Sequence, residues 1–387
     1  MSDTLWISAG ELSGDMHGAA LMQALKSRDS SLEFMGMGGP HLRAAGLSSL
    51  FAAEDLSVMG LTEVLGHLPR VLRMLSGMKS AMARIRPRAL IVIDAPEFHF
   101  RLIKIAHALR IPVYYYISPK VWAWRPGRAA FLRDHVRRLI SILPFEADFY
   151  QQYGMSIDYV GNPLVDIVDY PSLRHISPHP DLIGLLPGSR RREIAALLPE
   201  FGKAARILSR WFPRLVFACI RAPGIDEALL RAHWPADVPA RFEEPAERWR
   251  FMRQCRFLLA ASGTVTLESA LAGVPTLVAY RLSTVSFHIA RTLIRVPYIS
   301  LANLILNREV FPELLQDACN GQALADKISS WLSPESGPDL LAAMRCDLDE
   351  IRRRLGGPGA SARAAALILE DLAGTSRSCP PEKRCLS

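Results

Sequence analysis

The sequence has few cysteines, and none of them forms a pair of the C-x-x-C type. Six cysteines occur in 387 residues, far apart along the chain. Zinc clusters and the disulfide frameworks of small secreted domains need closely and regularly spaced cysteines. We therefore predict neither, and expect reduced thiols at Cys219, Cys255, Cys319, Cys346, Cys379 and Cys385.

Long hydrophobic runs are also missing. No uninterrupted apolar stretch reaches the roughly 18–20 residues that a transmembrane helix needs. The first residues, Met1–Asp3, lack the basic region of a signal peptide, and the apolar stretch 5–9 is too short for one. We expect a cytoplasmic protein whose contact with a membrane is peripheral.

The common metal and nucleotide motifs are absent as well. Neither the H-E-x-x-H pattern nor the G-x-x-x-x-G-K-[ST] pattern occurs. Asp347 and Asp349 match a D-x-D pattern, but they lie in a charged helical stretch, where a solvated face is the simpler interpretation. We predict no bound metal, no P-loop and no cofactor.

What the sequence does have is positive charge and a large apolar fraction. Lys and Arg number 46 against 38 Asp and Glu, so the formal net charge is +8. Such a surface favours an anionic partner, which could be a nucleotide, a nucleic acid or an anionic lipid. Because 50% of the residues are hydrophobic, the chain can build sizeable cores, and its length indicates two or three domains.

Short apolar runs alternate with longer helical patterns along most of the chain. This alternation predicts α/β folding, with parallel sheets covered by helices on both faces. Strands are predicted at 5–9, 33–37, 89–93, 112–117, 139–143, 157–160, 182–186, 215–220, 257–260 and 276–279. Helices are predicted at 17–26, 66–86, 101–109, 146–153, 191–210, 225–233, 246–253, 264–272, 323–332, 340–355 and 360–372.

The segment 166–181 is rich in Pro, Ser and His and has no clear period, so we predict an interdomain linker there. The chain then consists of two doubly wound halves in tandem. Ligands of such sheets bind at the carboxyl ends of the strands. Two halves that face each other would form one cleft.

Two loops of the first half place carboxylates at predicted strand ends. Gly10–Asp15 precedes a helix, and its Glu11 and Asp15 could bind hydroxyls or act as bases; an ordinary turn is the alternative. Asp94 ends a buried-looking strand, where partial burial can raise the pKa of a carboxyl group toward that of a general base. The alternative for Asp94 is a helix cap.

Two further segments could contact lipid. Trp122 and Trp124, next to Arg125, could stack on a sugar or lie against lipid, or they could pack in the core. The stretch 56–82, which includes Met59, combines apolar residues at helical spacing with basic residues. Core packing and a membrane surface both fit this second pattern.

The second half carries a glycine-containing loop with a cation. Gly188, Ser189 and Arg190 follow its first predicted strand and open a helix. Gly188 allows close approach of the backbone, Ser189 can cap the helix, and Arg190 can hold an anion in a bidentate manner. The loop therefore predicts phosphate binding.

A second helix opening lies in the same half. Ser262, Gly263 and Thr264 follow another predicted strand, and Glu268 lies one helical turn further along. Backbone N–H groups at this opening can hold phosphate, and Glu268 can accept hydrogen bonds from ribose hydroxyls. Two such openings in one half indicate a nucleoside diphosphate.

These motifs, in this order, resemble those of the lipid-A-disaccharide synthase family of bacterial glycosyltransferases. The matching stretches run from residue 10 to about residue 317, over three quarters of the chain. They read GELSGDMHGA, SVMGLTEVL, IDAPEF, YYISPKVWAWRPGR, LPFEADFY, VGNPLVD, LLPGSR, ASGTVTLESALAGVPTLVAYR and ISLANLILNREVFPELLQ.

The resemblance implies a GT-B fold, in which two Rossmann-like domains face a central cleft. We expect an acceptor- and membrane-facing domain over 1–168 and a UDP-sugar donor domain over 169–345. Helices over 346–374 would pack back across the domains, and residues 375–387 would form a flexible tail.

The resemblance also implies the reaction. The donor would be UDP-2,3-diacylglucosamine and the acceptor 2,3-diacylglucosamine 1-phosphate (lipid X), giving the β-1,6-linked disaccharide 1-phosphate and UDP. Such enzymes lie on the anionic cytoplasmic face of the inner membrane, without nucleic acid or metal. A homodimer is compatible with the resemblance.

Residue roles follow from the same comparison. We predict Asp94 as the base, with Glu11 and Asp15 as alternatives, and Asn162 on the acceptor side. The diphosphate would be held by Ser189, Arg190 and the N–H groups near 262–264. Glu268 would bind ribose, and Arg281, Asn303 and Glu309 would line the donor side.

The sequence departs from the family pattern at several positions. Leu12 replaces Ala, Glu97 replaces Asp, and His99 replaces Asn. Asn162 stands in place of a His, so it can form hydrogen bonds but cannot be protonated.

Two other classes of function stay open from the sequence. One is another GT-B enzyme acting on a UDP-sugar, such as a UDP-N-acetylglucosamine 2-epimerase, which a water-soluble substrate would favour. The other is a non-catalytic basic module that binds nucleic acid or anionic lipid. That class leaves both helix openings unexplained.

Overall fold

The computed structural model of the chain describes residues 3–57, 64–282 and 296–375. It divides into two compact units. Unit 1 comprises Met1–Pro163 together with Gly357–Ser387, and unit 2 comprises Leu164–Gly356. Each unit is an α/β structure of its own.

In the described part of unit 1, the sheet has seven strands in the order β3-β2-β1-β4-β5-β6-β7, and every neighbouring pair is parallel. The strands are β1 (Thr4–Ala9), β2 (Glu33–Gly38), β3 (Ser48–Ala52), β4 (Ala89–Ile93), β5 (Val113–Tyr116), β6 (Arg138–Ser141) and β7 (Asp158–Tyr159). The order reverses between β1 and β4, which makes this the switch point of the sheet.

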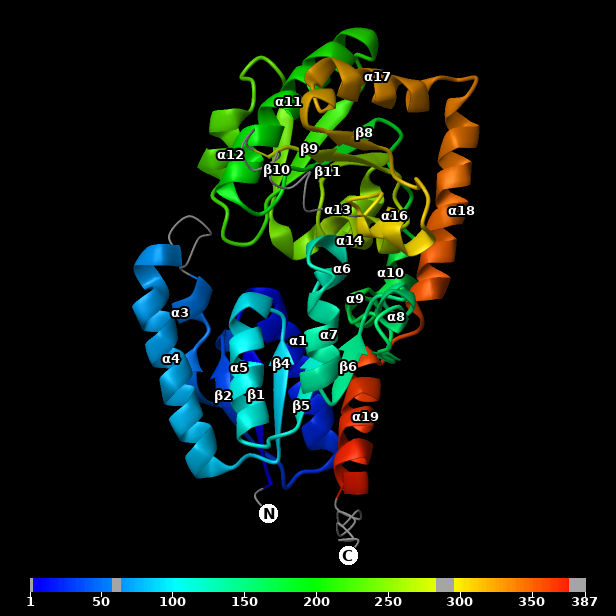
Figure 1. The fold of residues 1–387 in the computed structure, drawn as a ribbon. Coiled ribbons are helices and arrows are strands. Elements are labelled where there is room, and N and C mark those ends of the chain that lie inside the picture. Colours follow the sequence, from blue (N-terminus) through cyan, green and yellow to red (C-terminus); the bar gives the residue numbers. More distant parts are fainter. Residues whose placement is uncertain (1–2, 58–63, 283–295, 376–387) are drawn as a thin grey trace, which may run out of the picture. The chain divides into compact units, whose positions relative to one another are not determined.

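Helices cover both faces of this sheet (Figure 1). The helices of unit 1 are α1 (Leu12–Arg28), α2 (Pro40–Ala44), α3 (Glu54–Ser57), α4 (Val64–Ile85), α5 (Pro96–Ala108), α6 (Val121–Trp124), α7 (Arg128–His135), α8 (Glu146–Gln151) and α19 (Ala360–Thr375). Successive side chains of β1 enter opposite cores, because strand side chains alternate between faces. Leu5 and Ile7 pack in a core with residues of α1 and α19, whereas Trp6 packs in a core with residues of α4 and α5.

Within residues 164–282 and 296–356, the sheet of unit 2 has six parallel strands in the order β10-β9-β8-β11-β12-β13. They are β8 (Leu182–Leu186), β9 (Val216–Ile220), β10 (Ala240–Glu243), β11 (Phe257–Ala261), β12 (Thr276–Tyr280) and β13 (Glu313–Leu315). The order reverses between β8 and β11. The helices are α9 (Leu164–Ile167), α10 (Tyr170–Leu173), α11 (Arg191–Trp211), α12 (Glu227–His233), η1 (Pro245–Glu247), α13 (Arg248–Gln254), α14 (Thr264–Ala272), α16 (Leu301–Leu306), η2 (Gln316–Ala318), α17 (Gly321–Leu332) and α18 (Gly337–Leu355).

All ten predicted strands are present, and the prediction of two doubly wound α/β halves is confirmed. The strands that the sequence pattern missed are β3, β10 and β13, and each lies at an edge of its sheet. Edge strands are short, and most residues of these three are only partly buried. They therefore lack the continuous apolar run by which central parallel strands are recognised.

The division into units differs from the predicted domain boundaries. The chain passes from unit 1 to unit 2 after Pro163 rather than after residue 168, and it returns to unit 1 after Gly356. The predicted segment 346–374 is therefore split: α18 packs on α14, α16 and α17 in unit 2, whereas α19 packs on α1 in unit 1. The predicted linker 166–181 contains α10, which is anchored by the buried Leu173. The predicted tail lies almost wholly outside the described residues.

Candidate active site

The switch point of unit 1 brings the two predicted carboxylate loops together. Ala9, the last residue of β1, is paired with Ile93, the last residue of β4. The following residues, Gly10 and Asp94, are therefore neighbours, and the Gly10 N–H donates to Asp94 Oδ1 over 3.2 Å. Register between parallel strands, not proximity in sequence, creates this contact.

Asp94 and Ala95 both adopt left-handed backbone conformations, with φ of +53° and +39°. Two consecutive non-glycine residues in this region are uncommon, and such conformations persist where the surrounding structure enforces them. The Asp94 carboxylate lies over the first turn of α1. Its Oδ2 atom is buried and has no hydrogen-bond partner within residues 3–57, 64–282 and 296–375.

The environment of Asp94 favours its protonated form. Burial raises the pKa of Asp94 well above its usual value, and the charge of Glu11 acts in the same direction. The nearby backbone N–H groups of Gly10, Glu11 and Gly14 lower it. A carboxyl group whose pKa is raised in this way is suited to accept a proton near neutral pH.

Gly14 leaves the space that Asp94 occupies. A Cβ atom added at Gly14 would lie 1.6 Å from Asp94 Oδ2. We expect Gly14→Ala to displace the carboxylate and to lower kcat at least about tenfold, since small displacements of reacting groups are costly. Steady-state assays measure the effect. Gly374→Ala is the matched control, because this glycine is also helical and its added Cβ would meet nothing within 4 Å. Equal activity of the two variants would contradict the placement of Asp94.

The two alternative bases lie in different environments. Glu11 is exposed immediately before α1. Asp15 is buried, and its carboxylate accepts hydrogen bonds from the N–H groups of Gly39 (2.6 Å), His41 (2.8 Å) and Leu42 (3.2 Å). The prediction that Asp15 is an alternative base does not fit this environment, because its oxygens cap α2.

The residues predicted to face the acceptor are mostly buried. Trp122 is in the core, and its Nε1 donates to Glu146 Oε1 over 2.8 Å. Asn162 is also buried, and its Nδ2 donates to the carbonyl oxygen of Ile142 over 3.1 Å. A lipid-facing role does not fit Trp122, and Asn162 is held within unit 1. Met59 lies outside the described residues.

Trp124 and Arg125 remain at the surface of unit 1. The Arg125 guanidinium lies 4.1 Å from the centre of a Trp124 ring, and Arg128 lies 6.0 Å from it. Glu97 accepts hydrogen bonds from Arg125 (2.9 Å) and from both terminal nitrogens of Arg128 (2.6 and 2.9 Å). The cluster of Trp124, Arg125 and Arg128 therefore combines an aromatic ring with two cations. Glu97 balances only part of their positive charge.

Glu146 is a buried carboxyl group that the sequence did not single out. Besides Trp122, its side chain contacts the hydroxyl of Ser141, which also lies 3.0 Å from the carbonyl oxygen of Leu143. Because a hydroxyl has one proton, a neutral Glu146 can donate to Ser141 while Ser141 donates to Leu143. Burial raises the pKa of Glu146 to about 7, and hydrogen bonds that Ser141 and Trp122 can donate to the ionised carboxylate act in the opposite direction.

This raised pKa predicts a pH dependence of stability. Between the ordinary pKa near 4.5 and the folded value of about 7, the unfolded chain loses this proton and the folded chain keeps it. The contribution of Glu146 therefore decreases as pH rises through this window, by about 3 kcal/mol in total. We expect Glu146→Gln to remove this dependence in urea unfolding at about pH 5 and about pH 8. Asp148→Asn, on the exposed side of α8, serves as the control. An unchanged pH dependence in Glu146→Gln would contradict the assignment.

In unit 2, the loop after β8 already holds an anion. The Ser189 and Arg190 N–H groups donate to Glu193 Oε2 over 3.3 and 3.4 Å, and Arg190 Nη1 donates to Oε1 over 3.0 Å. Gly188 has φ of +107°, and a Cβ added there would lie 2.6 Å from the same carboxylate. The Arg190 side chain is 80% exposed, so it is accessible to a ligand.

The loop after β11 lies beside the loop after β8, because Ala260 is paired with Leu186. Ser262 Oγ donates to the carbonyl oxygen of Ile299 over 3.1 Å, Gly263 precedes α14, and Thr264 is exposed at its first turn. Further along α14, Glu268 is largely buried and forms a 3.0 Å ion pair with Arg248. Burial raises the pKa of Glu268, and the Arg248 charge lowers it. Arg248 is a partner of Glu268 that the sequence analysis missed.

The other three predicted donor residues differ in their availability. Glu309 is exposed, and Arg281 pairs with Glu200 over 2.9 Å while remaining partly accessible. Asn303 is fully buried: its Oδ1 accepts from the N–H groups of Val310 and Phe311, both over 2.8 Å. Its Nδ2 donates to the Phe311 carbonyl oxygen and to Glu313 Oε1 over the same distance. The prediction that Asn303 lines the donor side does not fit, because its side chain is saturated by protein groups.

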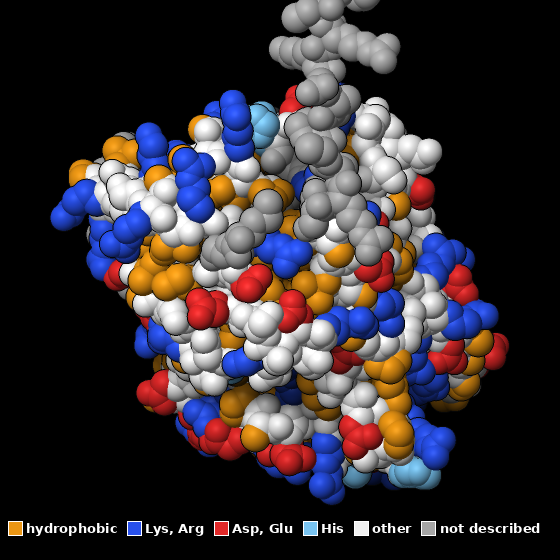
Figure 2. Space-filling view, turned by 90° about the horizontal axis from the view of Figure 1, so that it is seen from below, with side chains coloured by type: hydrophobic (Ala, Val, Ile, Leu, Met, Phe, Trp, Pro, Cys, Tyr) orange, Lys and Arg blue, Asp and Glu red, His pale blue; other side chains and the backbone are white. Residues whose placement is uncertain are grey.

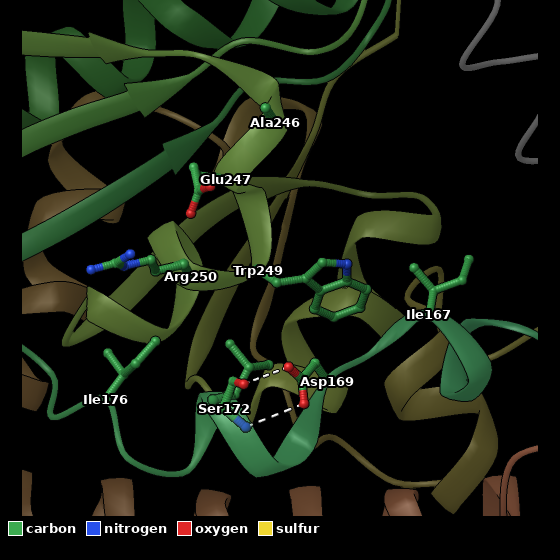
Figure 3. Close-up of a pocket in the computed structure, with 9 residues that line it drawn as sticks. Ile167, Asp169, Ser172, Ile176, Ala246, Glu247, Trp249 and Arg250 are labelled. Carbon is green, nitrogen blue, oxygen red and sulfur yellow. Dashed lines mark hydrogen bonds between the residues drawn. The ribbon is translucent and has the colours of Figure 1, made fainter.

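A pocket of about 410 Å³ in unit 2 has none of these predicted residues in its lining. It is lined by Ile167, Asp169, Ser172, Leu173, Ile176, Ala246, Glu247, Trp249 and Arg250. Figure 3 shows the Trp249 ring and the Arg250 guanidinium extending to opposite sides, and Asp169 hydrogen-bonded to Ser172. The hydrogen bond from the Ser172 N–H caps α10 and the one from the Ser172 hydroxyl supports it, which explains the position of Asp169 without a ligand.

Comparisons with known proteins agree with the resemblance seen in the sequence. The family model described as lipid-A-disaccharide synthetase matches residues 5–344. The lipid-A-disaccharide synthase of Myxococcus xanthus is 38% identical over 372 residues, covering 94% of this chain and 96% of the relative. That of Syntrophus aciditrophicus is 39% identical over 381 residues, covering 95% and 97%.

Solved structures agree at the level of the fold. The UDP-GlcNAc 2-epimerase of Neisseria meningitidis, bound to UDP-GlcNAc, superposes with a TM-score of 0.64 over 95% of this chain and all of that one, at 12% identity. The glycosyltransferase of kitacinnamycin gives 0.61 over 95% and 98%, at 15% identity. At such identities these likenesses show the GT-B fold alone. The sequence relatives settle the family, and the chain belongs to the lipid-A-disaccharide synthase family of glycosyltransferases.

Proposed function

We propose that the protein transfers the sugar of UDP-2,3-diacylglucosamine to the 6-hydroxyl group of 2,3-diacylglucosamine 1-phosphate. The products are the β-1,6-linked disaccharide 1-phosphate and UDP. The observation that carries this proposal is the Asp94 carboxylate at the switch point of unit 1. This carboxylate lies against the first turn of α1, and the chain belongs to this family.

The reaction inverts the configuration at C1 of the donor, so a single in-line displacement suffices. The acceptor oxygen forms the new bond to C1 as the bond from C1 to the diphosphate oxygen breaks. The hydroxyl proton passes to Asp94, and the electron pair of the broken bond leaves with UDP. The raised pKa of Asp94 supports its role as the proton acceptor. Glu11 is the remaining alternative, since Asp15 is committed to α2.

The diphosphate is assigned to the adjacent loops after β8 and β11. The Ser189 and Arg190 N–H groups and the Arg190 guanidinium, which now hold the Glu193 carboxylate, offer donors suited to phosphate oxygens. Charge that develops on the departing diphosphate is stabilised by such preorganised donors. Glu268, held by Arg248, is assigned to the ribose hydroxyls.

Acyl chains of both substrates are assigned to a lipid-facing surface of unit 1. No helix in the described residues is long and apolar enough to cross a membrane. Leu72 on α4 is 53% exposed, and the Trp124, Arg125 and Arg128 cluster adds an aromatic ring with cations. A different end of unit 1, seen in Figure 2, also carries Lys and Arg side chains beside apolar ones. This combination supports peripheral attachment to the anionic inner membrane.

The test is a reaction of purified protein with both substrates in detergent, with and without EDTA. We expect UDP release and disaccharide of the calculated mass, at the same rate in both conditions. UDP release without disaccharide would point to another acceptor. Binding of UDP without any release would contradict the proposed donor.

A further inference from the structure

His99 is a fully buried histidine directly beside Asp94. It is the fourth residue of α5, and its Nδ1 atom lies 2.6 Å from the backbone carbonyl oxygen of Asp94. Its Nε2 atom lies 2.9 Å from the hydroxyl oxygen of Ser8 on β1. The Tyr115 hydroxyl on β5 donates to the same Asp94 carbonyl oxygen over 2.7 Å.

The protonation of His99 follows from its partners. A carbonyl oxygen only accepts hydrogen bonds, so Nδ1 carries a proton and donates. In the neutral ring Nε2 then accepts from the Ser8 hydroxyl. Burial lowers the pKa of His99 to about 4, which keeps the ring neutral near pH 7. Ser8 thus donates to His99, His99 donates to the Asp94 carbonyl oxygen, and Tyr115 donates to the same oxygen independently.

That carbonyl oxygen belongs to the peptide between two left-handed residues. Asp94 and Ala95 have φ of +53° and +39°, a conformation that non-glycine residues adopt only at a cost in free energy. Two donors on the Asp94 carbonyl oxygen hold the peptide in this orientation. The same orientation directs the Asp94 side chain toward Gly10 and Gly14.

We propose that His99 and Tyr115 are positioning residues, which hold the Asp94 peptide in its left-handed conformation and so aim the carboxylate at the acceptor hydroxyl. The Asp94 carbonyl oxygen, which only accepts, fixes the tautomer of His99, and the Ser8 hydroxyl donates to the other ring nitrogen. This inference rests on the proposed role of Asp94 as the base. It assigns a role in the reaction to a buried histidine that does not touch substrate.

His99→Phe, His99→Asn and Tyr115→Phe separate positioning from packing. Phe fills the cavity of His99 without donating a hydrogen bond, whereas the Asn amide N–H can donate to the same carbonyl oxygen. We expect His99→Phe to lower kcat between about 10- and 100-fold with an unchanged KM for the UDP-sugar, and His99→Asn to restore part of it. Tyr115→Phe removes one hydroxyl only and should lower kcat severalfold. It keeps the test open should His99→Phe fail to fold.

The pH profile and a double-variant cycle give readouts that a packing defect would not move. Loss of a hydrogen bond to the Asp94 carbonyl oxygen should release the peptide and expose the Asp94 carboxylate to water. Because burial raises the pKa of Asp94, this exposure should lower it. The rising limb of kcat against pH should therefore move to lower pH in His99→Phe and Tyr115→Phe. In an Asp94→Asn background, His99→Phe should have no further effect on kcat.

Two results would overturn the inference and are distinguishable. Full activity of Asp94→Asn would remove the proposed base and the inference with it. The second result is an inactive Asp94→Asn together with a wild-type kcat and pH profile in His99→Phe or Tyr115→Phe. It would leave Asp94 as the base and overturn the positioning role alone. An equal loss from His99→Phe in both backgrounds would also overturn it.

Discussion

Asp94→Asn is expected to lower kcat by a factor of about 10² to 10⁴, the range that a general base contributes. Asn is nearly the same size as Asp and tolerates the left-handed backbone conformation that position 94 requires. It cannot accept the hydroxyl proton. Steady-state kinetics of disaccharide formation measure the loss, and the KM for the UDP-sugar should change little.

The controls separate lost chemistry from lost structure. UDP binding by calorimetry and the thermal midpoint of unfolding should match those of the wild type. Glu11→Gln, at the exposed position before α1, tests the remaining alternative base. A near-normal kcat in Asp94→Asn together with a large loss in Glu11→Gln would transfer the role to Glu11.

Arg190→Ala is expected to lower kcat/KM by about 10² to 10³, the usual effect of removing one donor from developing negative charge. The side chain is 80% exposed and its partner Glu193 lies only three residues further along, so its removal should cost little stability. UDP affinity should decrease as well. Kinetics over a range of donor concentrations, combined with calorimetry of UDP, measure both effects.

Arg192→Ala is the matched control, because it removes an exposed arginine two residues away on α11. Its kcat/KM should stay within about twofold of the wild type, as is usual for surface substitutions. Arg190→Lys adds a further check, since a lysine keeps the charge and loses the bidentate geometry. Unchanged kcat/KM in Arg190→Ala would exclude the loop after β8 as the diphosphate site.

The candidate site shows which kind of inference the sequence supports. Asp94 and Arg190 stand out because each follows a central parallel strand, and strands of this kind carry long apolar runs that are visible in sequence. Position at a strand end therefore follows from the pattern. Availability to a ligand does not, since it depends on which partners already surround a side chain.

Asp15 and Asn303 illustrate the limit. Both are polar residues in family motifs, and both are already bound by neighbouring segments. Asp15 is bound by backbone N–H groups, and Asn303 by backbone groups together with Glu313. Trp122 is similar: its indole N–H is bound to Glu146, 24 positions further along the chain. Composition and spacing cannot distinguish a polar group that awaits substrate from one that closes a turn.

The sequence by itself determined the class of fold, ten of the strands and the family, because apolar periodicity and glycine-containing loops are local properties. Only the tertiary structure decided which residues meet. The pairing of β1 with β4 joins Gly10 to Asp94, and the same sheet brings Ser8 and Tyr115 to His99. The register between strands is set by the burial of the apolar side chains on each face of the sheet, because a shift by one residue would move them to the other face. The contacts of Asp94 are therefore a property of the assembled sheet and of no single motif.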